Sequence, residues 1–129
     1  MASQGNVSQY DIVRKLARGG MGEVFLARQT GIAGFAKEVV LKRIHQSYAA
    51  DAQFVRMFLQ EARIAAMLDH PNIVQIIELG RRGDNYFIVM EHVRGLSLSR
   101  LLKAAAGPLP LPLAIQIAAG VAAGLQFAH

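Results

Sequence analysis

The sequence predicts an α+β fold, in which a five-stranded antiparallel sheet and one helix precede two further helices. Three observations lead to this prediction. Apolar residues follow a strand-like pattern over residues 10–44 and again over 73–93. Residues 51–68 carry apolar residues at the spacing of a helix. After residue 97, two apolar segments are separated by a linker rich in proline, which indicates two more helices.

The first three strands are expected at residues 10–18, 22–29 and 35–44. The second shows a period of two in the order Val24, Phe25, Leu26, Ala27. A glycine turn at residues 19–22 joins the first two strands as a hairpin. A second glycine-containing connection at 30–34 leads into the third strand, so the three strands should run as a meander.

A helix is expected over residues 51–68. Its apolar stripe is formed by Phe54, Phe58, Ala65 and Leu68. Glu61 falls on the same stripe, so we expect its carboxylate to face the core. The helix should end before Pro71, because proline disfavours the helical conformation of the preceding residue.

Two more strands are expected at residues 73–80 and 86–93, around a turn at 83–85. Ser97 is a suitable N-cap for a short helix over residues 98–106. Gly107 and Pro108 would stop that helix.

The last segment, residues 112–127, is apolar on nearly all sides and predicts a helix surrounded by other protein. A membrane span is the alternative, because residues 109–128 are about as long as the ~20 residues a bilayer requires. Prolines and glycines interrupt the stretch at Pro110, Pro112, Gly120 and Gly124. We therefore expect a core helix and no membrane partner.

Composition excludes several classes of protein. The net charge is +5, but the basic residues are scattered and no aromatic residues interleave them, so we expect no nucleic-acid partner. The absence of cysteine excludes disulfides and thiolate metal sites and agrees with a cytoplasmic location. Residues 1–9 contain no secretory signal and are expected to be a flexible leader.

The glycine turn is the first candidate for chemistry, because glycine lets backbone N–H groups approach phosphate oxygens closely. A purely structural hairpin is the alternative. The turn does not fit a dinucleotide fingerprint, since a strand follows it and position 42 is lysine. It does not fit a Walker A loop, since Gly22 is followed by Glu23 and Val24.

Lys42 and Glu61 are the second candidate. In a strand, Lys42 shares a face with Val40, so its ammonium would lie beside any flat ring bound there. A buried Glu61 needs a cation, and Lys42 is available. The alternatives are a solvated Lys42 and a Glu61 that pairs with Arg56 or Arg63.

No metal centre is predicted. The histidines are isolated from other ligand-type side chains at metal-binding spacing, at His45, His70, His92 and His129. No Ser-His-Asp arrangement can be argued either, because no serine has an activating context.

Taken in order, these residues closely resemble the serine/threonine protein kinase family of the bacterial eukaryotic-like type. Residues 17–24 resemble the glycine-rich loop of that family, and residues 39–42 resemble the family's Val-Ala-Ile-Lys motif. Glu61 and residues 70–74 match the landmarks that follow. The resemblance implies a kinase amino-terminal lobe, a hinge and the start of an incomplete second lobe, at residues 10–90, 91–96 and 97–129.

The resemblance also implies ATP as cofactor, with Mg²⁺ in a complete kinase domain, and a protein substrate. Lys42 and Glu61 would form the catalytic pair, with Lys42 on the α- and β-phosphates. The implied ATP-binding residues are Ala17, Gly19, Gly22, Val24, Val40, Lys42, Met90, Glu91, Val93 and Leu98. Among them Met90 is the gatekeeper, and Glu91 and Val93 offer hinge backbone groups to adenine.

Ala65 and Ile76 fall at two positions of the family's regulatory hydrophobic stack. Ala17 replaces the first loop glycine, which is tolerated if its φ is negative. Residues 125–129 resemble the helix that precedes the catalytic loop, so the catalytic base, the magnesium ligands and the Asp-Phe-Gly segment do not occur in these residues. We therefore expect residues 1–129 alone to lack kinase activity.

Two other interpretations are a non-catalytic interaction module and a truncated gene product without function of its own. The first would self-associate or bind a partner through the helix at residues 112–127.

Overall fold

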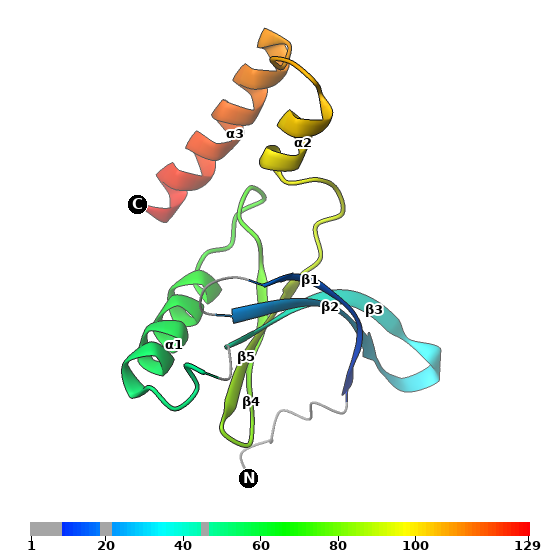
Figure 1. Cartoon of the computed structure of the whole chain (residues 1–129), viewed down its shortest axis with the longest axis vertical. Coiled ribbons are helices and arrows are strands. Elements are labelled where there is room, and N and C mark those ends of the chain that lie inside the picture. Colours follow the sequence, from blue (N-terminus) through cyan, green and yellow to red (C-terminus); the bar gives the residue numbers. More distant parts are fainter. Residues whose placement is uncertain (1–8, 19–21, 45–46) are drawn as a thin grey trace. The chain divides into compact units, whose positions relative to one another are not determined.

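The computed structural model describes residues 9–18, 22–44 and 47–129 (Figure 1). The strands are β1 (Tyr10–Arg18), β2 (Gly22–Thr30), β3 (Ala36–Ile44), β4 (Ile76–Arg82) and β5 (Asn85–Glu91). The helices are α1 (Ala52–Ala66), α2 (Leu98–Ala104) and α3 (Leu111–Ala128), with a 3₁₀ turn at Ile32–Gly34. The predicted α+β class is confirmed. Gly19 and most of the expected leader lie outside the described residues.

The five strands form one antiparallel sheet in the order β1-β2-β3-β5-β4. The first three make the expected meander, and β5 then pairs with both β3 and β4. β5 is internal because its buried run, Phe87 to Val89, needs cover on both faces. β4 is left as an edge strand, opposite β1.

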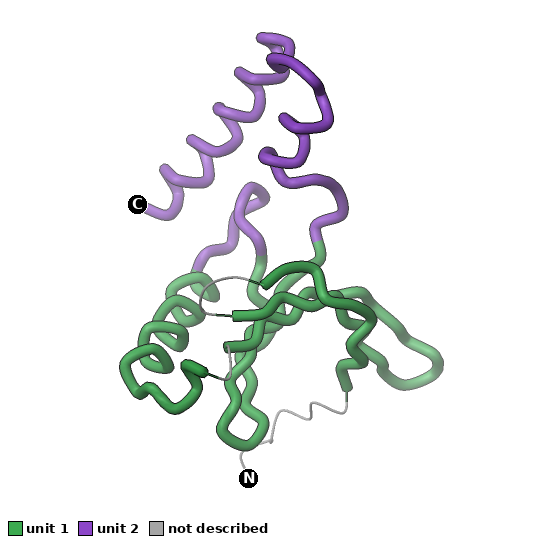
Figure 2. The backbone as a smooth tube through the Cα atoms, viewed as in Figure 1, with its two compact units in different colours: residues 1–67, 75–92 green, residues 68–74, 93–129 purple. Residues whose placement is uncertain are grey.

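The chain divides into two compact units (Figure 2). The first contains residues 1–67 and 75–92, and the second contains residues 68–74 and 93–129. Within the second unit, the side-chain amide of Asn72 donates to the carbonyl of Gly120 at 3.0 Å. The ring of His70 lies 5.1 Å from that of Phe127. These contacts group the segment after α1 with α3, whereas the sequence-based division kept it with the sheet.

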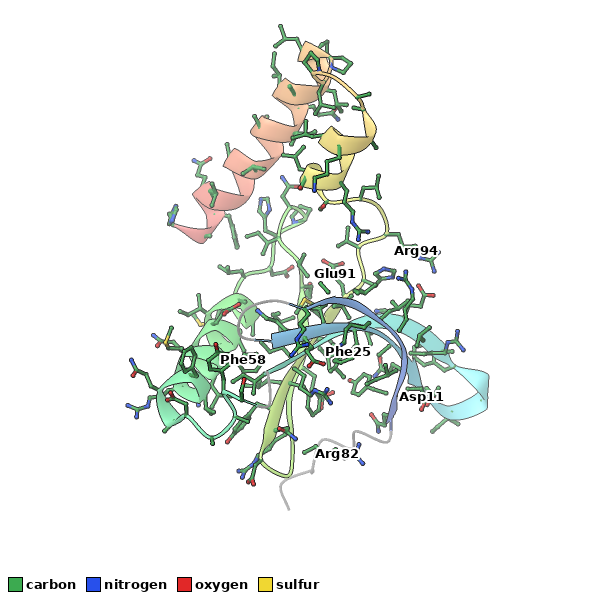
Figure 3. All side chains as sticks on the ribbon, viewed as in Figure 1. Asp11, Phe25, Phe58, Arg82, Glu91 and Arg94 are labelled. Carbon is green, nitrogen blue, oxygen red and sulfur yellow. The ribbon has the colours of Figure 1, made fainter. Side chains whose placement is uncertain are left out.

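The sheet of the first unit has a hydrophobic core on each face. One core comprises Tyr10, Phe25, Ala27, Val39, Leu41, Phe87 and Val89. On the other face, Phe58 and Ala62 of α1 pack against Ile44 and Ile88, and Figure 3 shows Phe58 directed from α1 toward the sheet. Successive strand residues point to opposite faces, so residues that alternate in sequence contribute to different cores.

Several expected element boundaries are wrong by two or three residues, among them those of β4 and β5. β4 begins at Ile76 instead of residue 73, because the N–H of Ile73 donates to the carbonyl of His70 at 3.0 Å in a turn. β5 ends at Glu91 instead of residue 93. The predicted N-cap of α2 is confirmed, since the Ser97 side chain accepts from the N–H of Arg100.

α3 is apolar but is not enclosed by the described residues. Gly124 is its buried residue. Its exposed side chains include Leu111, Ile115, Val121, Leu125 and Phe127. The described residues thus cover little of this helix, although its composition is typical of a helix surrounded by other protein. By length and composition alone, α3 is one helix that could cross a membrane.

Candidate functional site

The candidate site begins on the face of the sheet that carries α1. In the strand register Val24 lies opposite Lys42, and Val40 lies opposite Met90. Residues directly opposite each other point to the same face, and Val40 and Lys42 share it because they are two apart. The register therefore places the lysine ammonium beside three apolar side chains. All four were predicted site residues.

Lys42 forms an ion pair with Glu61 of α1. Its Nζ lies 3.3 Å from Glu61 Oε1, and the two side chains are 31% and 57% exposed respectively. An ion pair this open to water contributes little stability, typically about 0–1 kcal/mol. The pair therefore orients the lysine more than it stabilises the fold.

The predicted burial of Glu61 is wrong. α1 begins at its N-cap Asp51, whose carboxylate accepts from the N–H of Gln53 at 2.9 Å, and it docks through Phe58 and Ala62. With about 3.6 residues per turn, a stripe centred on those two residues leaves Glu61 at its edge. The carboxylate can reach Lys42 while keeping contact with water.

Ala17 and Gly22, two predicted site residues of the glycine loop, have distinct environments. A Cβ on Gly22 would lie 2.7 Å from the carbonyl oxygen of Arg43, so a larger residue would push β2 and β3 apart. Ala17 lies in β1 opposite Val24 with a negative φ, so the missing glycine causes no strain there. Gly19 falls outside the described residues, and its contact with phosphate stays a prediction.

Met90 and Glu91 end β5 and are half-buried. Val93 and Leu98 belong to the second unit, where they are 64% and 47% exposed. The roles of these four residues around a base stay predictions. Ala65 is half-buried on α1, and Ile76 packs against the core beneath that helix.

Contacts around Glu91 involve residues that sequence reasoning did not select. The carboxylate Oε1 of Glu91 accepts from the N–H of Gln75 at 2.9 Å, and the N–H of Glu91 donates to the carbonyl of Gln75 at 3.0 Å. Next to it, His92 Nδ1 lies 3.2 Å from Glu38 Oε2. These partners are 16 and 54 residues apart in sequence, so no local pattern could reveal them.

The opposite face of the sheet carries a separate charge cluster. The Oε2 atom of Glu23 lies 3.4 Å from Lys15 Nζ and 3.3 Å from Arg43 Nη2, and both cations also lie over the ring of Phe25. Burial raises the pKa of Glu23, but the hydrogen bonds and charges of Lys15 and Arg43 outweigh it and lower that pKa below its ordinary value. Glu23 thus balances two cations on the face away from Lys42.

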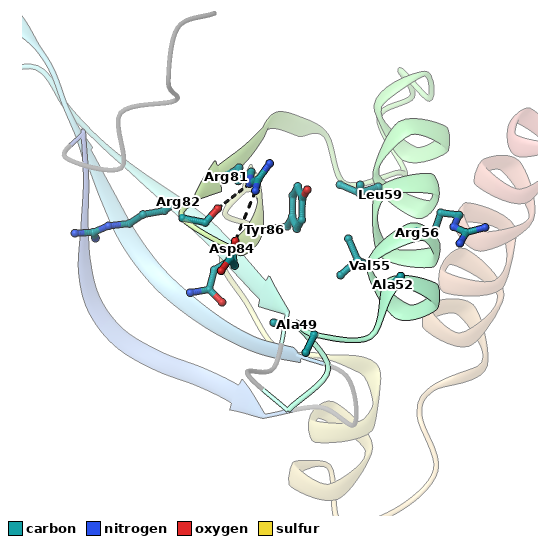
Figure 4. Close-up of a pocket in the computed structure, with 12 residues that line it drawn as sticks. Ala49, Ala52, Val55, Arg56, Leu59, Arg81, Arg82, Asp84 and Tyr86 are labelled. Atoms are coloured by element: carbon teal, nitrogen blue, oxygen red, sulfur yellow. Dashed lines mark hydrogen bonds and ion pairs between the residues drawn. The ribbon is translucent and has the colours of Figure 1, made fainter.

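A groove of about 670 Å³ lies between α1 and the β4–β5 hairpin (Figure 4). Val55, Leu59 and Tyr86 face it, and the guanidinium of Arg81 lies 5.4 Å from the centre of the Tyr86 ring. Its lining includes none of the predicted site residues. Among the described residues, no group of three His, Cys, Asp or Glu side chains is arranged to hold a metal ion.

Comparison with known proteins decides the family. The model of the family described as protein tyrosine and serine/threonine kinase matches residues 10–129. The chain belongs to the protein kinase family. As a kinase segment, it has the five strands and the ion-paired helix of an amino-terminal lobe in its first unit.

Curated bacterial kinases match nearly the whole chain. It is 46% identical over 123 residues to tyrosine-protein kinase MasK of Myxococcus xanthus, which covers 93% of this chain and 19% of MasK. It is 40% identical over 121 residues to serine/threonine-protein kinase PrkC of Bacillus subtilis, covering 94% of this chain and 18% of PrkC. The kinase segment thus spans less than a fifth of these relatives.

Solved kinase domains have the same fold. The crystal structure of the Mycobacterium tuberculosis PknI kinase domain matches with a TM-score of 0.77 and 32% sequence identity. The match covers 100% of this chain and 51% of that domain. The described fold is therefore that of the amino-terminal portion of a kinase domain.

Proposed function

We propose that this chain is the ATP-binding, amino-terminal part of a serine/threonine protein kinase domain. The observation that carries the proposal is the Lys42–Glu61 ion pair, 3.3 Å long, on the sheet face that also holds Val24, Val40 and Met90. An ammonium beside an apolar surface suits a nucleotide, since the base can pack on the surface and the ammonium can donate hydrogen bonds to phosphate oxygens. The parent reaction is transfer of the ATP γ-phosphoryl group to a protein hydroxyl.

The roles of the lobe are binding and orientation. Lys42, held by Glu61, would contact the α- and β-phosphates, and Gly22 and the undescribed Gly19 would cover the phosphates. Glu91 and Val93 offer hinge backbone groups to adenine, with Leu98 beside the ring. Among the described residues, none is assigned the role of magnesium ligand or catalytic base in this proposal. Residues 1–129 alone are accordingly proposed to have no phosphotransfer activity.

Calorimetric titration with Mg-ATP tests the binding. Wild-type chain releases heat, Lys42→Ala loses at least about tenfold in affinity, and Lys37→Ala, an exposed lysine of the same strand, binds as the wild type does. Absence of heat with the wild type, or equal affinities for all three proteins, overturns the proposal. Mg-ATP-dependent phosphorylation of a generic substrate by residues 1–129, lost in Lys42→Ala, would contradict the predicted inactivity.

Association through α3 is a second candidate function, favoured by its exposed apolar side chains Leu111, Ile115, Val121, Leu125 and Phe127. An apolar helix face of this kind is covered by protein in a stable assembly. Light scattering at micromolar concentration should then show a dimer or larger species. A monomer at that concentration rejects this candidate.

We place the domain in the cytoplasm, without a nucleic-acid or membrane partner. The scattered basic residues and the absence of cysteine support this location. Co-sedimentation of the chain with anionic vesicles would contradict it.

A further inference from the structure

The side chain of Glu91 takes a place that a backbone carbonyl occupies in a regular sheet. Two directly opposed residues of an antiparallel hydrogen-bonded pair exchange two N–H to C=O bonds. Glu91 and Gln75 make one of these, from the Glu91 N–H to the Gln75 carbonyl at 3.0 Å. The other N–H, that of Gln75, donates to the Glu91 carboxylate at 2.9 Å. The Gln75 N–H therefore donates to the side chain of Glu91 and not to its backbone carbonyl.

The local strand geometry explains why a side chain is needed here. The β4–β5 register shifts between Ile76 and Glu78, directly after Gln75. Glu91 is the last residue of β5, where Figure 3 labels it, so the two strands begin to separate at this point. A glutamate side chain is long enough to reach an N–H that the diverging backbone carbonyl does not satisfy.

The next residue, His92, contacts the strand on the other side of β5. His92 Nδ1 lies 3.2 Å from Glu38 Oε2, and Glu38 belongs to β3. Consecutive side chains of Glu91 and His92 thus fasten the end of β5 to both flanking segments of the sheet. The backbone between them is held in one orientation.

We propose that Glu91 is a positioning residue: its carboxylate occupies the Gln75 N–H and thereby leaves the Glu91 backbone carbonyl as the acceptor for the exocyclic amine of a 6-aminopurine nucleotide. This rests on the proposed ATP-binding function. A carbonyl oxygen only accepts hydrogen bonds, so it favours a purine with an amino group over one with an oxo group. The carboxylate therefore supports selection of ATP over GTP without touching the nucleotide.

The first experiment needs no nucleotide. In the wild-type chain, the NMR signal of the Gln75 amide proton should lie downfield, because its N–H donates to the Glu91 carboxylate at 2.9 Å. In Glu91→Ala that signal should move upfield, whereas in Asp84→Ala it should stay in place. A Gln75 amide signal that is the same in the wild type and in Glu91→Ala overturns the proposal.

The second experiment compares ligands by calorimetry. Glu91→Ala lets the Gln75 N–H turn to the backbone carbonyl, so ATP affinity should fall about tenfold and the preference for ATP over GTP should shrink. Affinity for tripolyphosphate should not change, which also shows that the variant is folded. Glu91→Gln should keep most of the ATP affinity, because its amide oxygen still accepts from Gln75. Asp84→Ala, which removes a fully exposed carboxylate, serves as the charge-matched control.

The outcomes separate this proposal from the one on which it rests. If the wild type does not bind ATP, ATP binding itself fails and the role of Glu91 fails with it. If the wild type binds ATP and Lys42→Ala weakens binding, but Glu91→Ala keeps both affinity and preference for ATP, only the role of Glu91 is overturned.

Discussion

The hydroxyl of Tyr10 donates a hydrogen bond of 2.5 Å to the carboxylate of Glu78. These residues lie on β1 and β4, the two edges of the sheet, which three other strands separate in the sheet order. The sheet therefore curls until its edges come within hydrogen-bonding reach. Tyr10 is also part of the core on the concave side, so one residue contributes both apolar packing and an edge-to-edge contact.

Removing this hydroxyl should destabilise the sheet. In Tyr10→Phe the ring still packs, but Glu78 loses its donor, and a hydrogen bond to a charged acceptor contributes about 2 kcal/mol. Urea unfolding should show a decrease of about that size in the free energy of unfolding. Tyr86→Phe, which removes a hydroxyl from a half-buried tyrosine of β5, should change the free energy of unfolding by less than about 0.5 kcal/mol. Equal losses in the two variants would argue against the edge contact.

The same hydrogen bond should disappear at high pH. Burial, then the hydrogen bond and charge of Glu78, raise the pKa of Tyr10 above its ordinary value of 10.0. A raised folded-state pKa means that the stabilisation is complete below the unfolded value and is lost as pH rises through the folded value. The difference in unfolding free energy between wild type and Tyr10→Phe should therefore be constant up to about pH 9 and fall above about pH 10. A difference that grows with pH contradicts this.

Glu23 should have the opposite pH dependence. Its pKa is lower in the folded chain than its ordinary value of 4.5, since Lys15 and Arg43 favour the carboxylate. The stabilisation is present above that value and is lost as pH falls through the lower folded-state pKa. The melting temperatures of the wild type and of Glu23→Gln should therefore approach each other as the solution is acidified from neutral pH. A difference in melting temperature between the two proteins that does not shrink on acidification contradicts this.

The pair of Lys42 and Glu61 should contribute little to folding. Because both side chains are partly exposed, a double-mutant cycle of Lys42→Met and Glu61→Gln should give a coupling energy in unfolding below about 1 kcal/mol. A coupling above about 3 kcal/mol would indicate a desolvated pair instead. Nucleotide affinity in the same four proteins measures the orienting role separately.

Gly80 should be intolerant of a side chain. A Cβ there would lie 2.1 Å from the ring of Phe87, which belongs to the core, so Gly80→Ala must displace the ring and should cost about 1–3 kcal/mol. Gly107 has nothing within 4 Å of the same position. Gly107→Ala should therefore leave the free energy of unfolding unchanged or raise it slightly. Chemical denaturation of both variants measures these changes, and equal free energies of unfolding for the two would contradict the prediction.

Much of the fold could be predicted because its signals are local. Asp51 and Ser97 cap helices whose starts are visible in sequence, and the strand periods of β1 to β3 extend over short windows. The position of β5 between β3 and β4 could not be predicted in this way. It depends on which strand needs cover on both faces, and that is settled when the strands meet.

For the candidate site, sequence reasoning selected Lys42 and Glu61 as partners but misjudged the environment of Glu61. Helical periodicity locates a stripe only to within a residue or so, and the docking of Phe58 and Ala62 decided which side of it the carboxylate takes. The hydrogen bonds between Glu91 and Gln75 could not be predicted from the sequence, since they depend on the local divergence of two strands.

The amino-acid sequence by itself determined the order and type of the elements, the family and the identity of the ion-paired residues, because periodicity, capping and motif spacing act over a few residues at a time. Only the tertiary structure decided the curl that joins Tyr10 to Glu78, the exposure of Glu61 and the partner of the Glu91 carboxylate. Each of these depends on distances between segments far apart in the chain, and such distances exist only after the sheet has closed and α1 has docked on it.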